Sequence, residues 1–118
     1  MTDRARAWIL IAYLAALLTL THLPPGAPSP SWRLWDKLEH TFSYAALGFL
    51  AGWARSRRGS LRTTRIVLLL LALAALDELT QPIVGRDADP LDWLADGLGC
   101  IVGLAAASLW RRASRREG

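Results

Sequence analysis

The stretch DELTQPIVGRDADPLDWLAD, residues 77–96, lies between two apolar runs that are each long enough to cross a membrane. It contains six acidic residues, one arginine, one glutamine and two prolines. A charged side chain at the centre of a membrane helix costs roughly 2.5 to 3.5 kcal/mol, so carboxylates at the ends of such runs should face protein or water. We therefore interpret this stretch as the facing ends of two membrane helices and as a candidate site.

The composition of the whole chain also indicates a membrane protein. The 118 residues are 53% hydrophobic with a mean hydropathy of +0.23, and the apolar residues occur in long blocks. A helix that is apolar on every side lies in lipid or in a large core, and a chain this short cannot build a large core. The sequence predicts an all-α integral membrane four-helix bundle that forms a single domain over residues 1–118.

Four segments are predicted to span the membrane. Their approximate bounds are residues 7–23, 36–54, 65–81 and 91–110. Pro82 is expected to stop the third helix and Pro90 to open the fourth, and the tail 111–118 is expected to be flexible. Glycines four residues apart allow helices to approach closely, and such pairs occur in the second and fourth segments, at Gly48 and Gly52 and at Gly99 and Gly103.

The distribution of charge predicts the orientation. If the leader is cytoplasmic, the cytoplasmic side holds eleven of the fourteen cations, and the opposite side holds eight of the ten acids. This arrangement satisfies the positive-inside rule with both termini in the cytoplasm, so the net charge of +4 requires no nucleic-acid partner. We expect a multi-pass protein of the bacterial cytoplasmic membrane. The single Cys100 excludes an intrachain disulfide and is expected to be buried.

Polar residues of the second, third and fourth segments lie at the same predicted membrane level, at the outer end. Adjacent helices would bring them together into an acidic, outward-opening pocket, in which Asp96 lies one turn deeper than Asp92. The predicted ligand-binding residues are Asp36, His40, Asp77, Glu78, Gln81, Arg86, Asp92 and Asp96.

Several interpretations of this cluster remain open. The residues could only cap helices and join the bundle by hydrogen bonds, or His40 could act as a base together with Glu78 or Asp96. One histidine with several carboxylates could hold a divalent cation, but the sequence contains no HExxH pattern, paired histidine or cysteine ligand set, so no metal and no other cofactor is expected. His22, at the end of the first segment, is interpreted as an interfacial residue.

The ordered motifs resemble a known family. They are Asp36-Lys37-x-x-His40, Asp77-Glu78-x-x-Gln81, Gly85-Arg86, and Asp92 followed by Asp96-Gly97-x-Gly99. Together they resemble the VanZ-like family of small bacterial membrane proteins, from the second segment to the end of the fourth. The first segment fits that family by position.

This resemblance implies a cell-envelope protein, since the family is named for a protein linked to teicoplanin resistance. The favoured hypothesis is a pocket that binds a lipid headgroup, a cell-wall precursor or a glycopeptide. The alternatives are a membrane-embedded enzyme that acts on a lipid-linked headgroup through His40 and a carboxylate, and a structural partner in an envelope complex. The sequence leaves the oligomeric state open.

Overall fold

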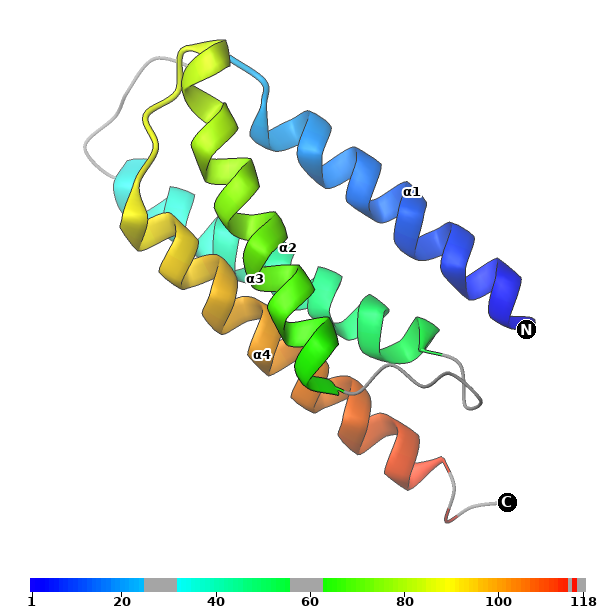
Figure 1. Cartoon of the computed structure of the whole chain (residues 1–118). Coiled ribbons are helices and arrows are strands. Elements are labelled where there is room, and N and C mark those ends of the chain that lie inside the picture. The colour runs from blue at the N-terminus through cyan, green and yellow to red at the C-terminus, as the bar shows by residue number, and fades with distance from the viewer. Residues whose placement is uncertain (25–31, 56–62, 115, 117–118) are drawn as a thin grey trace.

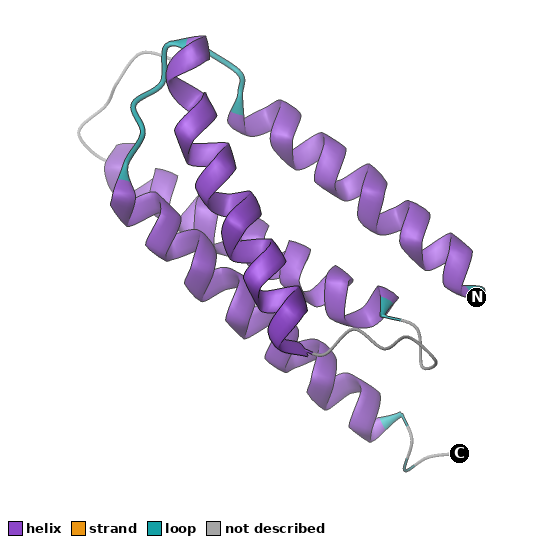
Figure 2. Ribbon diagram, viewed as in Figure 1, coloured by secondary structure: helices purple, strands orange, loops and turns teal. Residues whose placement is uncertain are grey.

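The computed structural model describes residues 1–24, 32–55, 63–114 and 116, and these residues form helices and short connections without a strand. Figures 1 and 2 show helices that run alternately up and down one elongated bundle, whose principal extents are 51, 23 and 23 Å. This arrangement confirms the predicted all-α bundle. Its elements are α1 (Asp3–Thr21), α2 (Trp32–Ala54), α3 (Thr63–Thr80), the 3-10 helix η1 (Gln81–Val84) and α4 (Pro90–Ala113).

The helices extend past several of the predicted span limits. Helix α1 begins at Asp3, where the Thr2 side chain caps it by accepting a hydrogen bond from the backbone N–H of Ala5 at 3.2 Å. The third α-helix ends at Thr80, close to the predicted limit before Pro82, and η1 then continues the chain through Pro82 as a tighter turn. Gly85 then reverses the backbone with a φ of 80°, a conformation that favours glycine.

The fourth helix is also longer than predicted. It starts at Pro90, after the Asp89 side chain accepts a hydrogen bond from the backbone N–H of Leu91 at 2.8 Å, and it continues to Ala113. Positions 111–113 of the predicted flexible tail are therefore helical. Positions 115, 117 and 118 of that tail lie outside the described residues.

Among the described residues, three helical segments have the length and composition to cross a membrane. They are Asp3–Thr21, Thr63–Val84 and Pro90–Ala113. Helix α2 is not one of them, although it has 23 residues, because its first half carries the polar sequence DKLEH, residues 36–40. Within this sequence His40 is buried and Asp36 and Lys37 are half-buried, whereas Leu38 and Glu39 are exposed.

The closest packing in the bundle is between α2 and α4, which lie against one another along most of their length. A Cβ atom added at Gly103 would collide with the backbone oxygen of Ala45 on α2, and one added at Gly48 would collide with the backbone of Cys100 on α4. The glycine pairs predicted from the sequence therefore face each other across this contact. Their lack of side chains allows the two backbones to touch.

The bundle has two chemically different ends. The polar end is where α1 ends, α2 begins, η1 lies and α4 begins; the basic end is where both chain termini lie (Figure 1). Exposed leucine and isoleucine side chains cover much of the outside of α3 and α4, as lipid-facing surfaces require. The apolar core between the ends is made by Leu17, Tyr44, Leu47, Ile66, Leu70, Ala74, Cys100 and Leu104.

Candidate functional site

The polar end contains an unusual number of buried polar side chains for a small helical bundle. Each of them is at most 5% exposed, and they come from α2, α3, η1 and α4. Buried groups of this kind are normally hydrogen-bonded, so their partners define how the site is built. These residues are His40, Asp77, Glu78, Gln81, Asp92 and Asp96.

His40 joins three helices at the centre of the polar end. Its Nδ1 lies 2.9 Å from Oδ1 of Asp96 on α4 and 3.8 Å from Oε1 of Glu78 on α3. All three side chains are almost completely buried. The predicted convergence of α2, α3 and α4 therefore occurs at these residues, which we call the His40 cluster.

Glu78 is held in place through both of its carboxylate oxygens. Oε1 accepts a hydrogen bond from Nε2 of Gln81 at 3.1 Å, and Oε2 accepts one from the backbone N–H of Asp89 at 3.1 Å. The second bond ties the loop before α4 to the end of α3. Glu78 and Gln81 therefore act together, as their three-residue spacing suggests.

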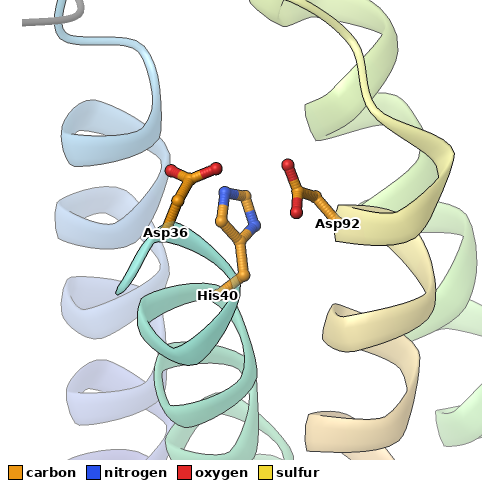
Figure 3. A group of neighbouring side chains, drawn as sticks. All are labelled: Asp36, His40 and Asp92. Carbon is orange, nitrogen blue, oxygen red and sulfur yellow. The ribbon is translucent and has the colours of Figure 1, made fainter. Parts of the chain in front are cut away.

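A second pair of carboxylates flanks the His40 ring. Figure 3 shows the imidazole between Asp36, one turn earlier on α2, and Asp92, at the start of α4. Lys37 donates hydrogen bonds to Asp89 at 2.8 Å and to Asp92 at 2.5 Å. This lysine was part of the sequence motif but was not predicted as a site residue.

Among the described residues, Arg86 pairs with one carboxylate of the polar end, that of Asp36. Its Nη2 donates to Oδ1 of Asp36 at 3.3 Å, and both side chains are 17% exposed. The guanidinium therefore lies at the rim of the polar end, while the histidine lies in its interior. Of the lysine and arginine side chains that the structure describes at this end, Arg86 pairs with Asp36, and Lys37 pairs with Asp89 and Asp92.

Asp77 belongs to a separate network. Its Oδ2 accepts a hydrogen bond from the hydroxyl of Tyr44 at 2.7 Å, and its Oδ1 accepts one from Thr21 at 2.8 Å. His22 lies 3.4 Å from the same Oδ1, and its other ring nitrogen lies 2.9 Å from the hydroxyl of Thr80. This network joins α1 to α2 and α3, so His22 is a bundle contact as well as an end residue.

Sequence reasoning missed the contribution of α1. Thr21 and His22 were not predicted as site residues because they follow a long apolar run and carry no motif. Tyr13 also reaches across, donating from its hydroxyl to the backbone oxygen of Ser43 at 2.9 Å. The available signal was the polar pair Thr21–His22 at the membrane level at which the other polar groups were predicted to lie.

A pocket of about 210 Å³ opens between α1 and α2 at the polar end. Of the eight predicted ligand-binding residues, Asp36, His40 and Arg86 line it, and the other five lie outside its lining. The predicted residues therefore divide between a pocket wall and buried clusters. The remaining lining residues are Leu17, Leu20, Thr21, Leu23, Pro24, Glu39, Ser43 and Tyr44.

Two groups of three side chains in the described part of the chain have the spacing to hold a metal ion. One is the His40 cluster, formed with Glu78 and Asp96, and the other is Asp36, His40 and Asp92. Both groups include His40, so the same imidazole lies next to two pairs of carboxylates. No metal-binding pattern is visible in the sequence, because each helix supplies only one or two of these ligands.

Comparison with known proteins supports the resemblance seen in the motifs. The searches of curated proteins and of solved structures found no match. A family model described as VanZ/LLP1 matches residues 7–111, which is most of the chain and includes most of α1. The motifs of α2, α3 and α4 and this match agree, and the chain belongs to the VanZ/LLP1 family.

Proposed function

We propose that this protein binds the headgroup of an envelope lipid or of a lipid-linked cell-wall precursor in the pocket between α1 and α2. The observation that carries the proposal is the mixed lining of that pocket. Asp36, Glu39 and Arg86 provide charge on one side, and Leu17 and Leu20 provide apolar surface on the other. A lipid presents the same combination, with a polar headgroup next to an acyl chain.

The size of the pocket narrows the class of ligand. Its 210 Å³ is room for several water molecules. A headgroup of the size of one sugar or one amino alcohol phosphate matches this space, whereas a complete glycopeptide antibiotic is much larger. A glycopeptide would therefore enter only with one substituent, and we favour the headgroup.

The charges of the lining favour a cationic or hydroxyl-rich group. Asp36 is paired with Arg86 at 3.3 Å, which leaves the carboxylate of Glu39 to interact with a ligand. The hydroxyls of Ser43 and Thr21 add neutral hydrogen-bonding groups to the lining. Ammonium and sugar hydroxyl groups complement such a surface.

We further propose that the polar end faces the outside of the bacterial cytoplasmic membrane and that both termini are cytoplasmic. The support is the positive-inside rule, since Arg4, Arg6, Arg65, Arg111 and Arg112 belong to the opposite end. Reporter fusions at each terminus test this orientation. The reporter is an enzyme that works only outside the cytoplasm. Activity of this reporter at either terminus overturns the proposed orientation.

Blocking the pocket tests the proposed function directly. Ser43→Phe places an aromatic ring among the lining residues, and Ser108→Phe makes the same change at an exposed position on α4, near the basic end. Native mass spectrometry of protein taken from its own membranes should find a lipid species that is retained by the wild type and by Ser108→Phe and lost from Ser43→Phe. Identical lipid profiles in all three proteins contradict the proposal.

A charge variant then tests the ligand class. Glu39→Gln removes one carboxylate from the lining, and Asp87→Asn removes one from an exposed position of the loop before α4. We expect Glu39→Gln, and not Asp87→Asn, to retain less of the bound species. Complementation of a deletion strain with the same variants, followed by teicoplanin susceptibility, measures whether pocket binding contributes to resistance in this family member.

An enzyme is the second candidate, and one observation favours it. His40 lines the pocket while its Nδ1 lies 2.9 Å from the buried Asp96, which is the arrangement of a base with an orienting carboxylate. Such an enzyme would act on a lipid-linked headgroup. Lipid profiling of the deletion strain complemented with His40→Gln tests it, because unchanged headgroup species in that strain contradict catalysis.

A further inference from the structure

The His40 cluster has the geometry of a ligand set. Donor atoms from His40, Glu78 and Asp96, on three different helices, all lie within 4.8 Å of one another. Ligands bound to one tetrahedral ion at 2.0–2.1 Å are about 3.3 Å apart. The separations of 2.9 Å and 3.8 Å from Nδ1 of His40 to the two carboxylates lie on either side of that value.

One atom of this cluster has no partner. Asp96 is completely buried, and its Oδ2 makes no hydrogen bond although Oδ1 contacts His40. A buried carboxylate oxygen without a donor loses its hydration and gains nothing in return. A group that the helices themselves do not supply is therefore needed to satisfy it.

The other two side chains have polar neighbours outside the cluster. Gln81 and the backbone N–H of Asp89 orient the Glu78 carboxylate, and Asp36 and Asp92 flank the His40 ring (Figure 3). Metal-binding side chains are commonly held by such outer contacts, and a carboxylate next to a ligating histidine is typical. Asp96 differs from them in having one oxygen left to bind.

The charge of the His40 cluster also favours a bound cation. Two carboxylates and a neutral imidazole carry a charge of about −2, and a divalent cation balances it among side chains that are almost completely buried. We propose that the His40 cluster binds one divalent transition-metal ion, of the Zn²⁺ or Mn²⁺ class, through one nitrogen and two carboxylate ligands. A nitrogen ligand favours these ions over Mg²⁺ and Ca²⁺, which prefer oxygen alone.

This site goes beyond the proposed headgroup pocket. Glu78 and Asp96 do not line the pocket, and His40 is the one side chain of the cluster that does. Ion binding can therefore be measured without any lipid. A protein that binds the ion but no headgroup, or a headgroup but no ion, separates the two proposals.

Cobalt is the probe for the first experiment. Purified wild-type protein in detergent is stripped with a chelator and titrated with Co²⁺, whose d–d absorption reports coordination by nitrogen and oxygen ligands. We expect the absorption to saturate at one ion per chain and to be lost when Zn²⁺ is added. Absence of a saturating d–d absorption in the folded wild type overturns the proposal, whatever the variants do.

Three variants then assign the ligands. His40→Gln, Glu78→Gln and Asp96→Asn should each weaken binding by more than the roughly 10- to 100-fold that the loss of a supporting outer contact costs. Asp77→Asn is the matched control, because Asp77 is equally buried on α3 but bonds to Tyr44 and Thr21. Equal affinity in Asp96→Asn and the wild type, or an equal loss in Asp77→Asn, overturns the assignment.

Discussion

The polar and basic halves of this bundle are held together in different ways. In the polar half, side chains bond to named partners across helices, as Tyr44 does to Asp77 and His40 to Asp96. In the other half, an apolar groove of about 550 Å³ separates α1 from α2 and α3, and its lining is mostly aliphatic. Directional bonds specify one arrangement, whereas aliphatic surfaces accept many, including lipid chains.

Helix α1 shows the contrast along its own length. Near the polar end it is tied to α3 by Thr21, which donates to Asp77. Toward the basic end it borders the groove through Leu10 and Leu14. One contact in this region is the Arg6 guanidinium, which lies 5.3 Å from the centre of the Trp53 ring. The two halves of α1 should therefore respond differently to substitution.

The largest effect on stability is expected at the contact between α2 and α4, which runs through both halves of the bundle. Gly103→Ala brings a methyl group against the backbone of Ala45 and Phe49, so the helices must separate. We expect the free energy of unfolding to fall by at least about 3 kcal/mol. Denaturation in mixed micelles, followed by circular dichroism, measures it.

Gly97→Ala is the control for this substitution. It makes the same change on the same helix, but the added methyl group meets only the end of the Leu71 side chain, which can move. Its effect should stay within about 1 kcal/mol. Equal effects of the two substitutions would mean that backbone contact between α2 and α4 does not hold the bundle together.

The second largest effect on stability is expected in the apolar half. Leu47→Ala truncates a side chain that is 1% exposed and lines the inner wall of the groove, and should cost about 2 to 3 kcal/mol. Leu69→Ala, at a groove residue that is 63% exposed, should change stability by less than about 0.5 kcal/mol. A large effect at Leu69 would show that the groove is closed by protein in the folded state.

A smaller effect is expected from removing one hydroxyl in the polar half. Tyr44→Phe leaves Oδ2 of the buried Asp77 without its donor and should cost about 1 to 2 kcal/mol. Tyr13→Phe removes a hydroxyl that donates to the partly buried backbone oxygen of Ser43, and should cost about 0.5 kcal/mol. The same denaturation measurement compares them, and the reverse order would contradict a polar half specified by buried bonds.

The smallest effect is expected at the rim. Lys37 is 30% exposed, so replacing it with Gln should cost less than about 1 kcal/mol even though it contacts two carboxylates. The cost should decrease as salt is added, since exposed ion pairs are screened. If the replacement lowers the free energy of unfolding by more than Tyr44→Phe does, and salt does not change this loss, the Lys37 ion pairs behave as buried interactions.

Periodicity and hydropathy predicted much of the fold. Runs such as IVLLLLALAAL, residues 66–76, predict helix from their length, and the acids at 77 and 78 mark where it nears the polar end. Helix ends were less accurate, because α1 already begins at Asp3 and α4 continues through Arg111 and Arg112. Those limits depend on local hydrogen bonds, which a hydropathy pattern does not contain.

The amino-acid sequence alone determined that this chain forms helices, that its polar residues lie at one end and that Asp36, His40, Glu78 and Asp96 lie at a shared depth, because helical rise and hydropathy are properties of single segments. Only the tertiary structure decided which of them meet. It put Asp77 with Thr21 and Tyr44, and His40 with Asp96, because the rotation of each helix is set by packing such as that of the glycines between α2 and α4.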